Sequence, residues 1–356
     1  MSDEKGLKEL RDKLDNIDDK LLDLINERME LVHQVGVLKA NSGGAIYRPE
    51  REKEIIKRLE ARNKGLLNNA AIEALFLEIF AISRNLELPE NIAFLGPEGS
   101  FTHQAAETRF GAMSSYISIG SIKGVFREVS TKKARFGVIP IENSSNGIVS
   151  DTINCLNNYE LKIIAEVILD IHHTLATTCD KVSEIKKIYS KDIAFDQCSR
   201  FLENFGLDEV EHIPIESTTK AAKLALNEPN AAAICSHVGA KMYNLPILFE
   251  NIEDKDNNKT RFFIVSDFEN APSGNDKTSI LAKLPNTPGA LVDFLIDFDK
   301  AKINLTKIKS HIVEGISIFF IDFDGHKNDS NVQEIFKKHE KSIKFLGSYV
   351  KEADDI

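Results

Sequence analysis

Hydrophobic positions divide the chain into three stretches of different periodicity. Over residues 1–88, apolar residues recur every three or four positions, which is the spacing of amphipathic helices. Pro49 suits the first turn of a helix, and Asn68 or Asn69 can cap the start of another. This stretch is therefore predicted to be all-α. The predicted helices span about 7–41, 50–63 and 69–87.

From Asn91 to about Phe268 the pattern changes to short apolar runs that alternate with helical stretches. Alternation of strands and helices is typical of an α/β fold with a largely parallel sheet. The predicted strands include Ile92–Leu95, Phe136–Ile141, Lys162–Leu169, Ile188–Ser190 and Ala231–Cys235.

A polar segment, Glu269–Lys277, is interpreted as a linker before the last part of the chain. The pattern of this last part predicts strand, helix, strand, strand, helix, strand, which is a ferredoxin-like βαββαβ unit of the α+β class. Its predicted strands are 278–284, 303–312, 315–323 and 343–350, and its helices 288–301 and 328–341. The chain is thus predicted to be multidomain, with domains over residues 1–90, 91–270 and 277–356.

Composition narrows the classes of function. At 356 residues the chain is long enough to bury more than one core. The net charge of -10 argues against non-specific nucleic-acid binding, which needs clustered cations, but leaves room for a small anionic ligand. The four cysteines form no CxxC pair and suit a reducing compartment. With no signal core and no apolar run of about 18 residues, we expect a cytoplasmic protein without membrane contact.

The first predicted helix carries Arg11, Arg28 and Lys39. At about 1.5 Å per residue, Arg11 and Arg28 are about 25 Å apart, too far to hold one metabolite together. Arg28 and Lys39 are about 16 Å apart and lie nearly on one face, so their long side chains can converge. If all three residues serve one site, Arg11 must come from a second chain, which predicts a homodimer packed along the apolar stripe of this helix.

These residues resemble the AroQ-type chorismate mutase domain. The matching stretches are Leu10-Arg11, Ile17-Asp18, Glu27-Arg28, Gly36–Lys39, Tyr47–Glu52, Ser83 and Glu87. The resemblance implies a helical enzyme that rearranges chorismate to prephenate by holding a compact conformer and stabilising charge on the ether oxygen. The substrate-binding residues that it implies are Arg11, Arg28, Lys39, Arg48, Arg51, Glu52, Ser83 and Glu87.

Within that set, the resemblance implies distinct roles. Arg11 and Arg28 clamp the substrate carboxylates, and Lys39 donates to the ether oxygen. Glu52 holds the substrate hydroxyl. Glu87, where some relatives have Gln, can donate to the ether oxygen only when protonated. The residues expected to be catalytic are Arg28, Lys39 and Glu87, whereas Arg48 stands where some relatives have Asp.

Polar residues gather at the ends of the predicted strands in the middle of the chain. Ile92–Leu95 leads through a glycine loop to Ser100 and Thr102, either of which can cap a helix and present its N-terminus to an anion. Phe136–Ile141 ends in Glu142-Asn143, at the carboxyl edge where ligands of α/β sheets bind. Further along, Ser217-Thr218 is another predicted cap.

These motifs resemble prephenate dehydratase, with GPEGSFTHQAA, VIPIENSSNG, DQCSRFL, EST and Thr260-Arg261-Phe262 as matches over about 91–268. The resemblance implies two subdomains around a cleft, similar to periplasmic binding proteins, and conversion of prephenate to phenylpyruvate. It points to Thr260 as the residue that is essential for protonating the leaving hydroxyl. The binding residues that it implies are Ser100, Thr102, Glu142, Asn143, Gln197, Cys198, Ser217, Thr218 and Arg261.

Two features of this middle part are interpreted as structural. His172-His173 is not expected to bind metal, because adjacent strand residues point to opposite faces. Before Gln197 the chain reads Ser190-Lys191-Asp192 where relatives have Ser-His-Pro, which changes a local loop. No metal or organic cofactor is implied.

The C-terminal unit resembles an ACT domain. Gly289-Ala290-Leu291-Val292 matches the motif linked to phenylalanine feedback, which makes these residues and Ser310 candidate effector contacts. The second motif, Glu-Ser-Arg-Pro in relatives, is Lys309-Ser310-His311-Ile312 here. The unit is therefore expected to bind L-phenylalanine more weakly, to bind another effector, or to serve only in dimerisation.

Taken together, the resemblances indicate a fused enzyme of phenylalanine synthesis, an isomerase and a lyase acting on chorismate and then prephenate. One alternative is that only one of the two activities is retained. Another is a ligand sensor without catalysis, which would have no need of Thr260 or of the set Arg11, Arg28, Lys39 and Glu52.

Overall fold

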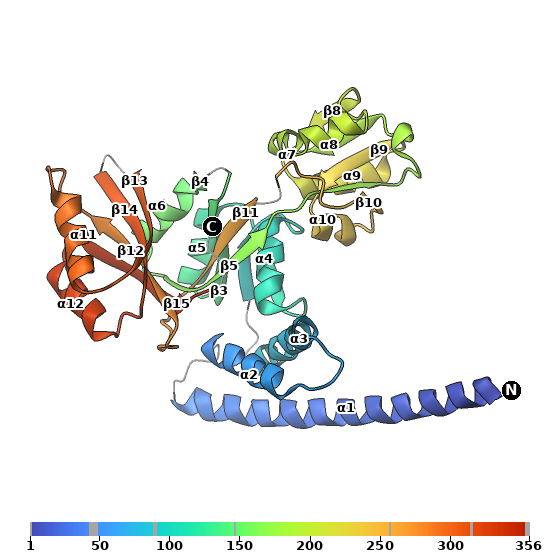
Figure 1. The fold of residues 1–356 in the computed structure, drawn as a ribbon, viewed down its shortest axis with the longest axis horizontal. Helices are drawn as coiled ribbons and strands as arrows, with labels where there is room; N and C mark the ends of the chain where they lie inside the picture. The colour runs from blue at the N-terminus through green and yellow to red at the C-terminus, as the bar shows by residue number, and fades with distance from the viewer. Residues whose placement is uncertain are drawn as a thin grey trace. The chain divides into compact units, whose positions relative to one another are not determined.

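The structure is a computed structural model, and it describes residues 2–42, 49–87, 91–145, 147–255, 258–313 and 316–352. Two compact units are present (Figure 1). The first comprises residues 1–90 with 110–114, and the second comprises residues 91–109 and 115–356.

The first unit is helical, as predicted. α1 contacts α3, and α3 contacts α2. The predicted starts are confirmed, because α2 begins at Pro49 and the Asn68 side chain accepts the Ala71 N–H at 2.8 Å ahead of α3. The helices are α1 (Ser2–Ser42), α2 (Pro49–Arg62) and α3 (Asn69–Glu87).

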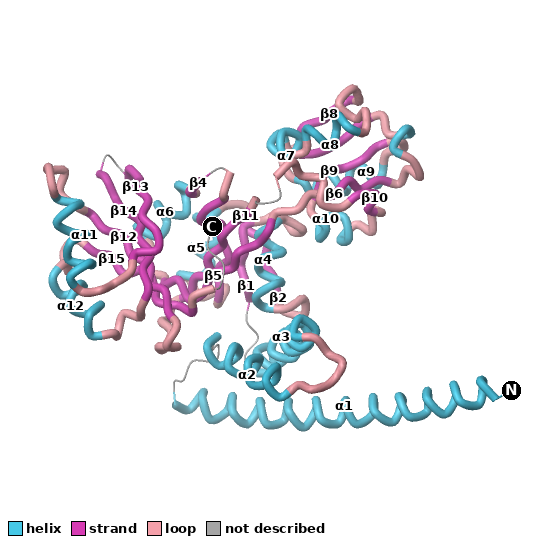
Figure 2. The backbone as a smooth tube through the Cα atoms, viewed as in Figure 1, coloured by secondary structure: helices cyan, strands magenta, loops and turns pink. Residues whose placement is uncertain are grey.

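The second unit begins with a six-stranded sheet in the order β2-β1-β3-β11-β5, with β4 paired to β3 (Figure 2). β1 pairs in parallel with β2 and β3, whereas β11 runs antiparallel to β3 and β5. The strands are β1 (Asn91–Leu95), β2 (Ser115–Ile119), β3 (Phe136–Asn143), β4 (Gly147–Ile148), β5 (Lys162–Asp170) and β11 (Lys259–Ser266). The helices are α4 (Phe101–Phe110), α5 (Ile122–Ser130) and α6 (Ser150–Asn158).

A second sheet, of five strands in the order β10-β6-β9-β7-β8, is inserted between β5 and β11. β7, β8 and β9 are parallel, as predicted, but β6 and β10 pair antiparallel because the chain enters and leaves this sheet from the first one. The strands are β6 (Thr174–Thr177), β7 (Lys187–Ser190), β8 (Glu211–Pro214), β9 (Ala231–Cys235) and β10 (Ile247–Phe249). The helices are α7 (Asp192–Gln197), α8 (Ser199–Asn204), α9 (Thr218–Asn227) and α10 (His237–Met242), with a 3₁₀ turn at Val182–Glu184.

The third sheet confirms the predicted βαββαβ order and is antiparallel, in the order β13-β14-β12-β15. Its strands are β12 (Asp276–Lys283), β13 (Leu305–Val313), β14 (Ile316–Asp324) and β15 (Ile343–Val350), and its helices are α11 (Ala290–Lys300) and α12 (Ser330–Lys338). The linker prediction extends too far, because Asp276 and Lys277 belong to β12 and are buried.

Strand β12 of the third sheet is buried on both faces. Ile280 packs with Phe294 and Phe298 under α11, whereas the next residue, Leu281, joins the core of the first sheet. Phe320 and Tyr349 also belong to this core of the first sheet. The C-terminal sheet therefore shares a hydrophobic core with the first sheet of its unit, and alternation along each strand assigns residues to one side or the other.

Candidate active sites

A cavity of about 280 Å³ lies where the chain crosses between the first and second sheets. Its lining includes Ile171 and His173 from the first crossing and Asn258 and Thr260 from the second. The predicted dehydratase residues that line it are Ser100, Thr102, Asn143, Gln197, Ser217, Thr218 and Thr260. Strand ends and helix starts that are far apart in the sequence thus meet at one cavity.

Thr260 and Asn143 form a hydrogen-bonded pair in this lining. They are register partners on the antiparallel strands β11 and β3. The Asn143 Nδ2 donates to the Thr260 Oγ1 at 2.8 Å, and its Oδ1 accepts the Ser145 N–H at 3.0 Å, which fixes the orientation of the amide. Because the Thr260 oxygen accepts this bond, its own proton can be donated into the cavity.

Two helices begin at the cavity, each with a serine cap. Ser100 Oγ accepts the His103 N–H at 3.3 Å ahead of α4, and Ser217 Oγ accepts the Lys220 N–H at 3.1 Å ahead of α9. A helix N-terminus favours anionic groups, because the helix dipole is positive there and a serine cap leaves other N–H groups of the first turn without a partner in the helix. The cavity therefore suits a ligand with carboxylates.

Gly99 lies where the glycine loop before α4 meets α9 and α10. Its φ is +74°, a left-handed conformation that glycine adopts without strain. A Cβ at this position would lie 2.9 Å from the Thr219 side chain. The close approach brings the α4 and α9 starts to the same cavity.

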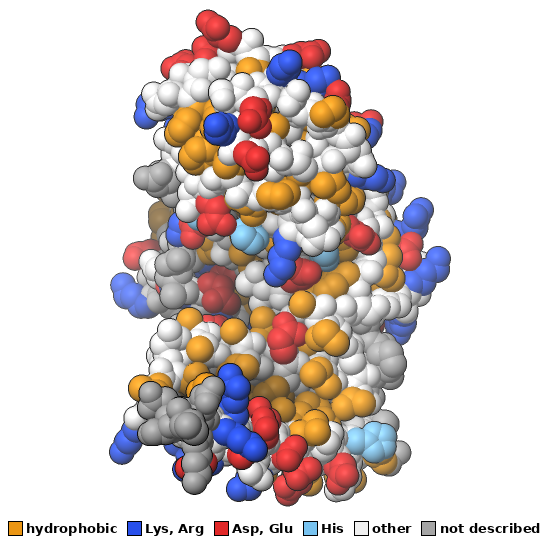
Figure 3. Space-filling model, turned by 90° about the vertical axis from the view of Figure 1, so that its right-hand side faces the viewer, with side chains coloured by type: hydrophobic (Ala, Val, Ile, Leu, Met, Phe, Trp, Pro, Cys, Tyr) orange, Lys and Arg blue, Asp and Glu red, His pale blue; other side chains and the backbone are white. Residues whose placement is uncertain are grey.

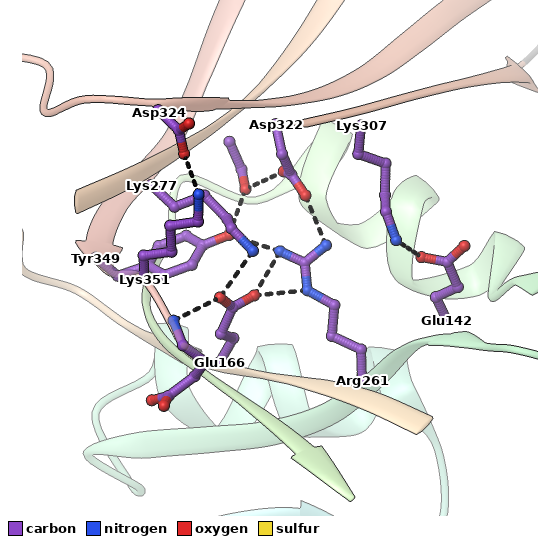
Figure 4. Close-up of polar contacts among 11 residues, drawn as sticks. Glu142, Glu166, Arg261, Lys277, Lys307, Asp322, Asp324, Tyr349 and Lys351 are labelled. Carbon is purple, nitrogen blue, oxygen red and sulfur yellow. Dashed lines mark hydrogen bonds and ion pairs between the residues drawn. The ribbon is translucent and has the colours of Figure 1, made fainter. Parts of the chain in front are cut away.

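The prediction that Arg261 fixes substrate carboxylates is wrong. Next to Thr260 on β11, it points to the opposite face, as strand alternation requires. Its guanidinium forms ion pairs with Glu166 and Asp322, each at 2.6 Å, and donates to the Tyr349 hydroxyl at 3.0 Å (Figure 4). Only 1% of the residue is exposed, so it has no access to the cavity.

Glu142 and Cys198 are also wrong as cavity residues. The Glu142 carboxylate faces the C-terminal sheet and pairs with Lys307 and Lys309. Cys198 is fully buried in the apolar core of the second sheet, and burial raises the pKa of its thiol. Each is a sequence neighbour of a cavity residue, Asn143 or Gln197, but projects away from the hollow.

His173 is a cavity residue that was interpreted from the sequence as structural. It is 3% exposed, and burial lowers the pKa of its imidazole, so the neutral form is favoured. Its Nε2 bonds the Gln197 Oε1 at 2.8 Å, which makes Nε2 the protonated nitrogen and Nδ1 an acceptor. Among the described residues Nδ1 has no partner. The signal available in the sequence was its place just beyond the end of a predicted strand, between β5 and β6 of the structure.

The helical unit brings some of its predicted residues together. Arg28 on α1 donates to the Ser83 Oγ on α3 at 2.6 Å. Glu52 on α2 pairs with Arg84 of α3, whose other nitrogen donates to the Phe110 carbonyl at 2.7 Å. Arg28, Ser83 and Glu52 thus come from three helices of one bundle.

The other mutase predictions divide into exposed and undescribed residues. Arg11 is exposed on α1, and Arg51 is exposed and pairs with Glu54 at 3.0 Å. Arg48 lies outside the described residues. The side chains of Lys39 and Glu87 lie outside them as well, although both positions are helical.

One side of α1 is strongly apolar and exposed. The exposed residues at helical spacing include Leu10, Leu14, Ile17, Leu21 and Leu24, each more than half exposed. An apolar face of this length is rare on a protein that acts as a single copy.

The predicted effector residues occur at the start of α11 and on β13. Gly289 has φ +86° and precedes the helix, Ala290 borders a cavity of about 300 Å³, and Ser310 is exposed on β13. That cavity is also lined by Asp293, Phe294, Asp297 and His339. Leu291 is half-buried and Val292 exposed on α11.

Charged side chains of the two signs are mixed on the molecule. Figure 3 shows acidic and basic side chains interspersed with hydrophobic ones on one face.

In the part of the chain that the structure describes, no helix is long and apolar enough to cross a membrane. No cluster of three or more His, Cys, Asp or Glu residues there could hold a metal ion.

Comparisons with known proteins match both parts of the chain in which the candidate sites lie. Residues 10–88 match the chorismate mutase type II family, and residues 92–270 match the prephenate dehydratase family. The bifunctional chorismate mutase/prephenate dehydratase of Aquifex aeolicus is 38% identical over 97% of this chain and 98% of that protein. The protein of the same name from Escherichia coli is 30% identical over 99% and 98%.

A solved structure is similar as well. The prephenate dehydratase of Arthrobacter aurescens in complex with L-Phe has a TM-score of 0.67 and 33% identity, over 73% of this chain and 90% of that one. Each domain match covers the residues from which the corresponding site is built. The chain therefore belongs to the family of bifunctional chorismate mutase/prephenate dehydratases, enzymes of phenylalanine biosynthesis.

Proposed function

We propose that the two reactions of this enzyme are divided between its two units. The helical unit rearranges chorismate to prephenate, and the cavity between the first two sheets converts prephenate to phenylpyruvate. The observation that supports the second assignment most is the Thr260 hydroxyl, held by Asn143 at 2.8 Å and facing a cavity with two capped helix starts.

In the dehydratase reaction the bond from the ring to its carboxylate breaks and releases CO₂. The electron pair moves into the ring, and the bond to the ring hydroxyl breaks at the opposite carbon. The hydroxyl takes up one proton and leaves as water, so one proton is consumed for each CO₂ and water released. We assign that proton donation to Thr260.

A threonine hydroxyl is a poor acid and needs help. The Asn143 N–H that it accepts stabilises negative charge developing on Oγ1 as the proton leaves. Neutral His173 supplies an acceptor and not an acid, because burial lowers its pKa. With Arg261 excluded, the N-termini of α4 and α9 take over the role of binding the substrate carboxylates.

For the mutase we propose a site shared between two copies of the chain. Arg28 and Ser83 are held together at 2.6 Å, whereas Arg11 lies about 25 Å from Arg28 along the same helix. An antiparallel pairing of two α1 helices through the exposed leucine face brings Arg11 of a second copy to Arg28. Lys39, Glu52 and Glu87 complete this proposed site, with the roles that the resemblance implies.

For the C-terminal unit we propose an ACT domain with L-phenylalanine as its effector. The Arthrobacter aurescens relative is in complex with L-Phe. Here Ala290 borders a cavity that also has Asp293, a carboxylate that attracts an ammonium group.

We also propose a cytoplasmic location, since the four cysteines are free, as in a reducing compartment.

The dehydratase assignment is tested with supplied prephenate and variants at Thr260. Thr260→Val keeps the shape of the side chain and removes the hydroxyl, so phenylpyruvate formation should fall by at least about a hundredfold. Thr260→Ser keeps the hydroxyl and should retain a large part of the rate. Equal rates for wild type and Thr260→Val would exclude Thr260 as the proton donor.

A further inference from the structure

The catalytic pair lies on strands whose opposite faces touch the C-terminal sheet. Asn143 and Thr260 are register partners that face the cavity. The adjacent partners, Glu142 and Arg261, face the other way. Both of them contact residues of the C-terminal sheet. This sheet therefore contacts β3 and β11 on the face opposite the cavity, at the positions next to Asn143 and Thr260.

The two contacts differ in character. Arg261 belongs to a fully buried cluster with Glu166, Lys277 and Asp322, in which two cations face two carboxylates (Figure 4). This cluster and the shared apolar core both hold the C-terminal sheet against the first sheet. The Glu142 contact adds to them at a separate position.

The Glu142 carboxylate forms ion pairs with two lysines. Lys307 pairs with one carboxylate oxygen and Lys309 lies 3.4 Å from the other. The Lys307 and Glu142 side chains are 10% and 7% exposed, whereas the Lys309 side chain is 47% exposed. The two lysines alternate with Ile308 along β13 and therefore share one face of it, so this strand holds Glu142 from one side.

We infer that Lys307, assisted by Lys309, is a positioning residue of the dehydratase, which acts through Glu142 on Asn143 and Thr260. Glu142 and Asn143 share a peptide unit, so a displaced Glu142 carboxylate turns the strand end that carries the Asn143 amide. The bond from that amide to Thr260 is 2.8 Å long, and a shift of about 1 Å is enough to cost a large part of a rate. The inference rests on the proposed role of Thr260.

The test is made in the full-length chain with prephenate as substrate. Lys307→Met leaves a nearly buried carboxylate facing only the more exposed lysine, so we expect kcat to fall about tenfold or more with little change in KM. Lys309→Met should lower kcat by less than about threefold, because a half-exposed ion pair is weak. Lys307→Arg, which keeps the charge, should restore most of the rate.

The C-terminal sheet supplies a matched control. Lys344 of β15 also reaches across to the first part of the unit, where it donates to the carbonyls of Asn157 and Tyr159 at 2.9 and 2.8 Å. These residues do not line the cavity. Lys344→Met should therefore leave dehydratase kcat unchanged, and thermal melting of the same samples reports that the second unit of each variant is folded.

A double-mutant cycle separates positioning from general damage. If Lys307 acts through Glu142, adding Lys307→Met to Glu142→Gln should change kcat by less than about twofold, although each single change lowers it. Full additivity of the two losses would overturn the inference, as would equal effects of Lys307→Met and Lys344→Met. Lack of turnover by the wild type would instead refute the proposed dehydratase function.

Discussion

Replacing Arg261 with methionine removes one of two cations from a buried cluster that holds two carboxylates. Glu166 and Asp322 are each 1% exposed and lie 2.6 Å from the guanidinium. In the variant Lys277, 3.0 Å from Glu166, is the cation of the described cluster that remains to balance them. Methionine fills a similar volume, so the principal effect is one uncompensated buried negative charge.

The magnitude of the effect is set by that uncompensated charge. Removing one partner of a buried ion pair costs about 3–5 kcal/mol. For a unit of this size each kcal/mol lowers the melting temperature by about 2–4 °C, so a loss of about 6–20 °C is expected. Adding Asp322→Asn to Arg261→Met removes the excess charge and should recover a large part of this loss.

The assay is differential scanning calorimetry of the full chain, followed by prephenate kinetics on the folded fraction. Arg127→Met is the matched control, since the Arg127 side chain is 71% exposed, and its melting temperature should stay within about 1 °C of the wild type. If Arg261→Met melts like the wild type but has a much higher KM for prephenate, Arg261 binds substrate and the buried-cluster interpretation is refuted.

Three further predictions concern other parts of the chain. Gly99→Ala should lower stability by about 1–2 kcal/mol and abolish dehydratase while sparing mutase activity, whereas Gly120→Ala, with open space around it, should do neither. Burial depresses the folded-state pKa of His173, so the buried neutral imidazole contributes stability that should be lost as pH falls below about 6.5. Urea titrations of His173→Gln should show a smaller loss of unfolding free energy over the same pH range. Mixing inactive Arg11→Ala and Arg28→Ala chains should restore part of the mutase activity, and no recovery in verified heterodimers would refute the shared site.

Periodicity was sufficient to predict the helices and most strands, because amphipathic spacing and strand alternation are local properties. The sequence also indicated caps at Ser100 or Thr102 and at Ser217-Thr218, of which the serines cap α4 and α9, and it located the strand end that carries Asn143. The family motif added Thr260, which lines the cavity.

The sequence alone could not show which face of a strand each neighbour occupies. Thr260 and Arg261 are adjacent in one motif, yet one faces the cavity and the other a cluster completed by Asp322, 61 positions further along. Glu142 was misplaced for the same reason, since its partner Lys307 belongs to another sheet. His173 was overlooked because its importance depends on Gln197 and the cavity, which are tertiary features.

The most direct test of the two assigned activities supplies chorismate to the purified chain and quantifies prephenate and phenylpyruvate over time. We predict that the wild type converts chorismate to phenylpyruvate, and that Thr260→Val consumes chorismate at the same rate but accumulates prephenate. If the wild type leaves both chorismate and supplied prephenate unchanged, the assignment of the two reactions to these two units is contradicted.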